Sequence, residues 1–157
     1  MRFGAVAAAI AIVVLGHAAR AAVNGDPAGA RILHDYVLTM DKVKHYDDAT
    51  AAFEAAAKND PRLQADGRSM MTEPQRTFAD IVAKFKRHPR LYAFYAKAGL
   101  TPFDTAAVPI ALSYACLANR YPELAAKMAD HTSATQISFC KAHMDEINAL
   151  KTFRSRP

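Results

Sequence analysis

Two cysteines are the residues whose type and placement most directly suggest a covalent bond. Cys116 and Cys140 both fall in stretches predicted to be helical. In an oxidising compartment an even number of cysteines permits a disulfide. The alternative is that each thiol is a small core residue, since both have apolar neighbours in sequence. Both interpretations stay open, because the relative register of two helices requires geometry.

Histidines and methionines could hold a metal or a haem if they converged. After residue 21 the histidines form no i, i+4 pair, and a zinc site needs three or four convergent ligands. The segment 140–143 lacks the second thiol and the adjacent Cys-His pair of a covalent haem site. A haem- or metal-binding bundle is therefore kept only as an alternative, and no cofactor is expected. The candidate ligands for a non-covalent haem are Met40, Met144, His45 and His143.

A basic and aromatic segment surrounds the helix break expected before Pro89. Its cations lie in the last turns of a predicted helix and just after it, where positive charge suits the helix dipole. That structural role alone explains them, but the segment could also contact anionic lipid or an acidic envelope component. A peripheral envelope-associated protein is thus a second alternative. The candidate surface consists of Lys84, Lys86, Arg87, Arg90, Tyr92 and Tyr95.

Motifs of common enzyme classes are missing from the sequence. It contains no nucleophile elbow, no HExxH metal motif and no phosphate-binding loop. The adjacent Asp47 and Asp48 suit a solvated helix face. We therefore predict a binding or structural protein and not an enzyme. The formal net charge of +5, of which Arg2 and Arg20 supply two charges, is too small to indicate a nucleic-acid binder.

The first 21 residues have the order of a secretory signal peptide. A positive start at Arg2 precedes an uncharged apolar run at 4–16 and the small-residue motif Ala19-x-Ala21, after which cleavage is expected. The run is shorter than the about 20 residues of a membrane-spanning helix. No cysteine follows the cleavage site to carry a lipid anchor. We expect a periplasmic or secreted protein that does not span the membrane.

Residues 22–157 are predicted to form one helical domain. Hydrophobic residues make up 52% of the chain, with only six glycines and no tryptophan. Alanine-rich stretches favour helix, and from Met40 to Ala57 the apolar residues recur every three or four positions. Short connections favour antiparallel neighbours. The predicted fold is all-α, a single irregular up-and-down bundle of about five or six helices.

Capping and breaking residues predict several helix ends. Capping boxes are expected at Thr72–Gln75 and at Ser133–Gln136. Gly99 predicts a left-handed helix end with the next residue packing back. The helix that follows is expected to bury a stripe that begins at Phe103, and to kink at Pro109.

Three further segments complete the prediction. Residues 28–40 favour helix, although the run 36–39 would also suit an extended piece. Residues 62–71 are interpreted as a short polar connection. One final helix is expected to carry the apolar residues from Ile137 to Ile147.

Three stretches of the sequence resemble a family of small, exported, uncharacterised bacterial helical proteins. They are YVLTMDKV at 36–43, the stretch 88–115 and FCKAHMDEINAL at 139–150. The shared layout is a signal peptide, an LTMDK-like start, a Gly-Leu-Thr helix junction and a closing amphipathic helix. The resemblance implies export and a single helical domain. It implies no activity, ligand or catalytic residue, and the cysteines are not part of its pattern.

Overall fold

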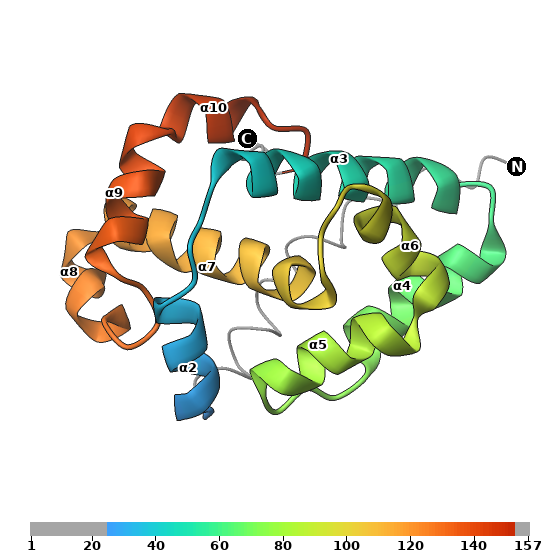
Figure 1. Ribbon diagram of the computed structural model, residues 1–157, viewed down its shortest axis with the longest axis horizontal. Coiled ribbons are helices and arrows are strands. Elements are labelled where there is room, and N and C mark those ends of the chain that lie inside the picture. Colours follow the sequence, from blue (N-terminus) through green and yellow to red (C-terminus); the bar gives the residue numbers. More distant parts are fainter. Residues whose placement is uncertain (1–24, 153–157) are drawn as a thin grey trace, which may run out of the picture.

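The structure, a computed structural model, describes residues 25–152 (Figure 1). The signal peptide predicted at 1–21 lies outside the described residues. Within 25–152 there are nine α-helices, one 3-10 helix and no strand. The all-α prediction is confirmed, with more helices than the five or six expected.

The helices follow one another through short connections. In chain order they are α2 (Pro27–His34), α3 (Met40–Ala57), α4 (Pro61–Thr72), α5 (Phe78–Arg87), α6 (Pro89–Lys97), α7 (Pro102–Arg120), α8 (Pro122–Ala125), the 3-10 helix η1 (Ala126–Met128), α9 (Ala134–Ala142) and α10 (Met144–Ala149).

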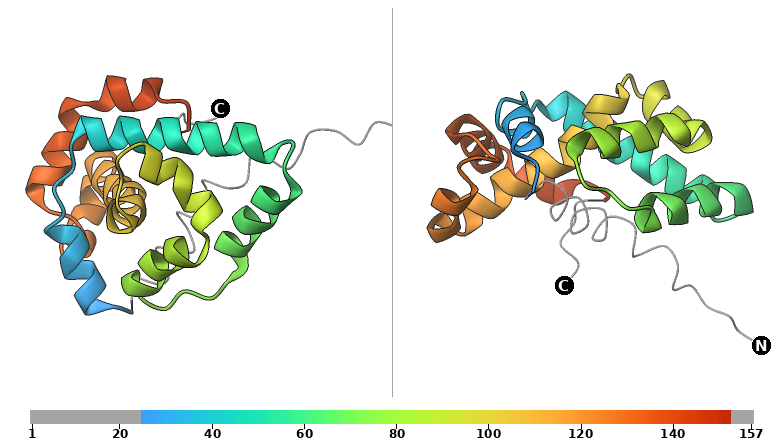
Figure 2. Two further views of the ribbon diagram at one scale, coloured as in Figure 1. Left: turned by 45° about the vertical axis from the view of Figure 1, so that its right-hand side comes forward. Right: turned by 90° about the horizontal axis from the view of Figure 1, so that it is seen from below.

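Helix α7 is the centre of the fold. Helices α2, α3, α5, α6, α8 and α9 all contact it, and the left view of Figure 2, which looks nearly along α7, shows the others arranged around it. Its alanines 107, 111 and 115 are fully buried. Their four-residue spacing forms a stripe of small side chains on which neighbouring helices come close. The helix continues through Pro109.

Two predicted helix ends are confirmed. Gly99 has a φ of 81°, and the N–H of Leu100 donates to the Tyr95 carbonyl at 3.0 Å, which is the 6→1 bond of a Schellman motif. Ser133 and Gln136 form the expected capping box at the start of α9. These local signals therefore determine where α6 ends and where α9 begins.

The interpretation of residues 62–71 as a connection was wrong, because they form most of α4. Asp60 accepts from the N–H of Arg62 at 2.8 Å and Pro61 occupies the first turn. The same residues that end α3 thus also start α4. The capping box predicted at Thr72–Gln75 was also wrong. The capping box of α5 is formed by Thr77 and Asp80.

Two further segments differ from the favoured prediction. Helix α2 ends at His34, and residues 36–39 are not helical. The side chain of Gln136 explains this end, since it donates to the carbonyls of Leu33 and Tyr36 at 2.7 Å each. The final helix is divided into α9 and α10 at His143.

None of the helices described in 25–152 is by itself long and apolar enough to cross a membrane. Helices α6 and α7, which meet at 77°, satisfy length and composition only as a bent pair.

Candidate functional site

The disulfide interpretation of the cysteines is supported. Cys116 on α7 and Cys140 on α9 are bonded, with 5.3 Å between their Cα atoms. Cys140 is fully buried, and Cys116 packs against the same core. The bridge therefore joins the central helix to α9.

The basic-aromatic surface was wrong for two of its members, because Lys84 and Tyr95 are buried. The Lys84 amine donates to the carbonyls of Met70 at 2.9 Å and Glu73 at 2.7 Å. Met70 lies in the last turn of α4 and Glu73 is its C-cap residue, where backbone acceptors have no partner within the helix. Burial lowers the pKa of Lys84. This lysine is a structural tie between α4 and α5.

Ion pairs neutralise two more of its cations. Arg87 pairs with Glu73 at 3.1 Å and Arg90 with Asp66 at 3.0 Å. Tyr92 is half-buried, and its hydroxyl donates to the Leu100 carbonyl. Lys86 is exposed and has no ion pair within the described part of the chain. The segment 84–95 thus offers far less free charge than its sequence suggests.

His88 lies between the carboxylates of Asp66 and Glu73, which also pair with Arg90 and Arg87. These five residues form one polar cluster. Its Nδ1 is 3.3 Å from an Asp66 oxygen and its Nε2 is 3.0 Å from a Glu73 oxygen. Hydrogen bonds from Ser69 and then from Arg87 and His88 lower the pKa of Glu73 to about 2. Each charge has a partner, so the cluster serves as a clamp between α4 and the α5–α6 junction.

The pKa of Glu73 in this cluster predicts that the stability of the folded protein decreases at acidic pH. The pKa of Glu73 is about 2 in the folded protein against an ordinary 4.5. Its contribution is present above about pH 4.5 and is lost as pH falls towards 2. Thermal midpoints from pH 7 to 2 should therefore fall less steeply in Glu73→Gln, which also starts lower at pH 7. Glu123→Gln, at an exposed position, should follow the wild-type profile. Parallel profiles for wild type and Glu73→Gln would refute this role.

Asp47 is another carboxylate with a structural role, and its interpretation as solvated was wrong. It is buried and accepts from the N–H groups of Lys151 at 2.9 Å and Thr152 at 2.7 Å. It anchors the chain after α10 onto α3.

No group of three or more His, Cys, Asp or Glu side chains within residues 25–152 is arranged to hold a metal ion. Of the residues imagined for a haem, His143 is bonded to Glu146 at 2.8 Å. Met40 and Met144 pack against the core.

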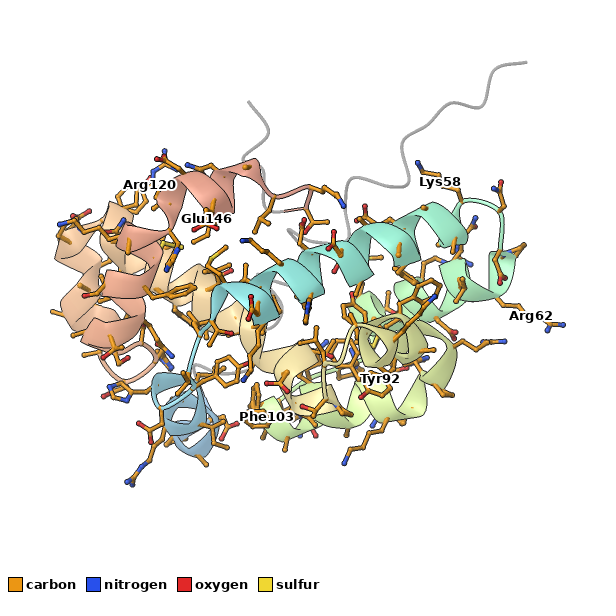
Figure 3. All side chains as sticks on the ribbon, turned by 45° about the horizontal axis from the view of Figure 1, so that its top comes forward. Lys58, Arg62, Tyr92, Phe103, Arg120 and Glu146 are labelled. Atoms are coloured by element: carbon orange, nitrogen blue, oxygen red, sulfur yellow. A yellow bond between two sulfur atoms is a disulfide. The ribbon has the colours of Figure 1, made fainter. Side chains whose placement is uncertain are left out.

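The feature that stands apart is an exposed apolar groove beside the first turn of α7. Ile32, Val37 and Phe103 are 41%, 69% and 39% exposed. They line two open depressions of about 680 Å³ and 470 Å³, which share Ala28, Ile32 and Phe103 and so form one continuous feature. Figure 3 shows Phe103 between α2 and α5. We call this feature the apolar groove; its other apolar lining residues include Val82 and Ala79 on α5.

The walls of the apolar groove are held in place by specific contacts. The Asp26 carboxylate accepts from the N–H of Gly29 at 3.0 Å and of Phe78 at 2.8 Å, which joins α2 to α5. A Cβ at Gly29 would lie 2.7 Å from the Phe78 Cβ, so only glycine permits this approach. The Phe103 ring packs edge-to-face with the Phe78 ring, with 5.5 Å between the ring centroids. The groove is therefore preformed.

Asp104, the acidic group at the α7 side of the apolar groove, is paired within the protein. Asp104 accepts from the Tyr36 hydroxyl at 2.8 Å and pairs with Lys42 at 3.0 Å. Burial acts to raise the pKa of Asp104, but hydrogen bonds from Thr101, Lys42 and Tyr36 outweigh it and lower the pKa to about 2. Burial, with the bond to Asp104, raises the pKa of Tyr36 far above its usual value. Asp104 is thus charged and paired.

The sequence did not indicate the apolar groove. Phe103 belongs to an apolar stripe that predicts burial, but it lies in the first turn of α7, where coverage by neighbours is incomplete. Ile32 and Val37 also sit in an apolar stretch. Val37 lies beyond the end of α2, in the non-helical segment whose Tyr36 carbonyl accepts from Gln136 in another part of the chain.

Comparison with protein-family models, curated proteins and solved structures gives no significant match.

Proposed function

We propose that this is an exported, non-catalytic binding protein that docks an apolar segment of another protein in the apolar groove. The observation that carries this proposal is the gathering of exposed apolar side chains around one preformed depression. Four large hydrophobic residues in 25–152 are exposed, and three of them, Ile32, Val37 and Phe103, line the groove.

Apolar surface exposed to water is unfavourable in free energy, so a cluster of exposed apolar side chains indicates a binding role. Each Å² left in water forgoes about 25 cal/mol of transfer free energy, and contiguous apolar patches on soluble proteins commonly mark interaction sites. The fourth exposed residue, Tyr121, follows the opposite end of α7 and lines neither depression. Apolar exposure is therefore concentrated at the groove.

Export rests on two independent features. Residues 1–21 have the charge and apolar pattern of a cleavable signal peptide. The Cys116–Cys140 pair forms a disulfide, and such bonds persist in oxidising compartments. A periplasmic or secreted location fits both features.

Serine at Ile32 and Val37 should remove the site without unfolding the protein. Both side chains are exposed, so the thermal midpoint should change by no more than about 2 °C. Fluorescence titration with Nile red, an uncharged apolar dye, should show binding to wild type and at least about tenfold weaker binding to the Ile32→Ser/Val37→Ser variant.

Tyr121→Ser is the matched control, since it removes a comparably exposed apolar residue elsewhere. It should bind the dye as wild type does. Equal dye binding by all three proteins would exclude the groove as the apolar site.

A further inference from the structure

We infer, resting on the proposed function, that the partner inserts an amphipathic helix that carries acidic residues beside its apolar face. Two properties of the apolar groove lead to this partner: the helical nature of its main walls, and the sign of the charge that remains unpaired at its rim.

The walls determine the conformation of the occupant. Ile32, Val82 and Phe103 project from α2, α5 and α7, and first-turn N–H groups at the groove are bonded to the side chains of Asp26 and Thr101. Such walls offer side chains but few backbone donors or acceptors. An α-helix satisfies its own backbone hydrogen bonds and so needs only side-chain contacts with such walls. Apolar grooves between helices are a recurring receptor for amphipathic helices.

The rim determines the charge of the occupant. Lys86 lines the depression on the α5 side, is exposed and has no ion pair within the described residues. Arg31 lines the depression on the α7 side and is 87% exposed. Its contact with Asp35 is 3.9 Å long and exposed, and such pairs contribute about 0–1 kcal/mol.

The acidic groups at the rim do not cancel these two cations. The Asp26 carboxylate accepts hydrogen bonds from two backbone N–H groups. Asp104 pairs with Lys42 and accepts from the Tyr36 hydroxyl. Asp35 lies 2.9 Å from the nearer nitrogen of His34. Arg31 in one depression and Lys86 in the other can therefore pair with a ligand. A bound helix with carboxylates on both sides of its apolar face would place them near these two cations.

A displayed peptide library tests this partner without knowledge of its identity. Apolar positions at i, i+3, i+4 and i+7 are varied among Leu, Ile and Phe, and the flanking positions among Glu, Gln and Lys. Half of the library carries a central proline, which prevents helix formation. Selection on the natively exported protein should enrich Glu over Lys at the flanks by at least about threefold, and should deplete proline.

Two variants separate the outcomes. Arg31→Glu/Lys86→Glu should reverse the preference from Glu to Lys, while Lys58→Glu/Arg62→Glu, at the far end of the molecule from Phe103 (Figure 3), should keep it. Enrichment that Ile32→Ser/Val37→Ser abolishes, but without any charge preference or with proline retained, would overturn the acidic helix and leave the proposed function intact. Failure to enrich any peptide, with Nile red still bound, would overturn a helical partner. A dimer that blocks Nile red binding would assign the groove to a second copy of the chain.

Discussion

Replacing Lys84 with alanine is expected to lower the free energy of unfolding by about 3–5 kcal/mol. The substitution removes the donor to the Glu73 carbonyl and leaves the Met70 carbonyl with only the longer bond from the Gln75 amide at 3.3 Å. Each unsatisfied buried group costs about 1–3 kcal/mol, and the lost side-chain volume adds a cavity term. Urea unfolding followed by circular dichroism at pH 7 measures the change.

Two neighbouring substitutions give this experiment its controls. Lys84→Met keeps most of the volume and removes only the donor, so it should cost less than alanine. Lys86→Ala, two residues away and exposed, should stay within about 0.5 kcal/mol of wild type. A Lys84→Ala protein as stable as Lys86→Ala would show that Lys84 is not the tie between α4 and α5.

Removal of the disulfide is the second large effect. Opening the Cys116–Cys140 link, which spans a sequence separation of 24, should lower the free energy of unfolding by about 3.5 kcal/mol through the entropy of the unfolded chain. The Cys116→Ser/Cys140→Ala protein combines a polar replacement at the less buried position with a small apolar one in the core. Urea unfolding with and without reductant checks the prediction.

Reductant should destabilise the wild type to nearly the level of this double variant and leave the variant unchanged. Intact mass under native export should match a chain that has lost two hydrogen atoms and residues 1–21. Free thiols in the exported protein, or a variant as stable as wild type, would contradict a stabilising bridge.

Local signals in the sequence are sufficient for much of the fold. Gly99 and the Ser133–Gln136 box predict their helix ends because the interactions involved lie within a few residues of one another. Helix α4 was missed because its Asp60-Pro61 start also stops α3, and because few apolar positions, such as Leu63 and Met70, mark its buried face.

The candidate site depends on contacts that sequence spacing does not contain. Lys84 was assigned to a surface because its acceptors, the carbonyls of Met70 and Glu73, belong to the end of the missed α4. The exposure of Val37 depends on Gln136, which lies about a hundred residues away in the chain. Periodicity identifies which residues are apolar, but burial depends on where each element ends.

Site-specific photocrosslinking in the host cell tests the central claim most directly. Val37, the most exposed large apolar residue of the groove, is replaced by p-benzoylphenylalanine, and the same replacement at Arg62 marks an exposed position far from Phe103 (Figure 3). We expect position 37 to form a covalent adduct with another exported protein, to lose it when Ile32→Ser is added, and position 62 to form none. Equal adducts at both positions, or none at position 37, would contradict a binding function for the apolar groove.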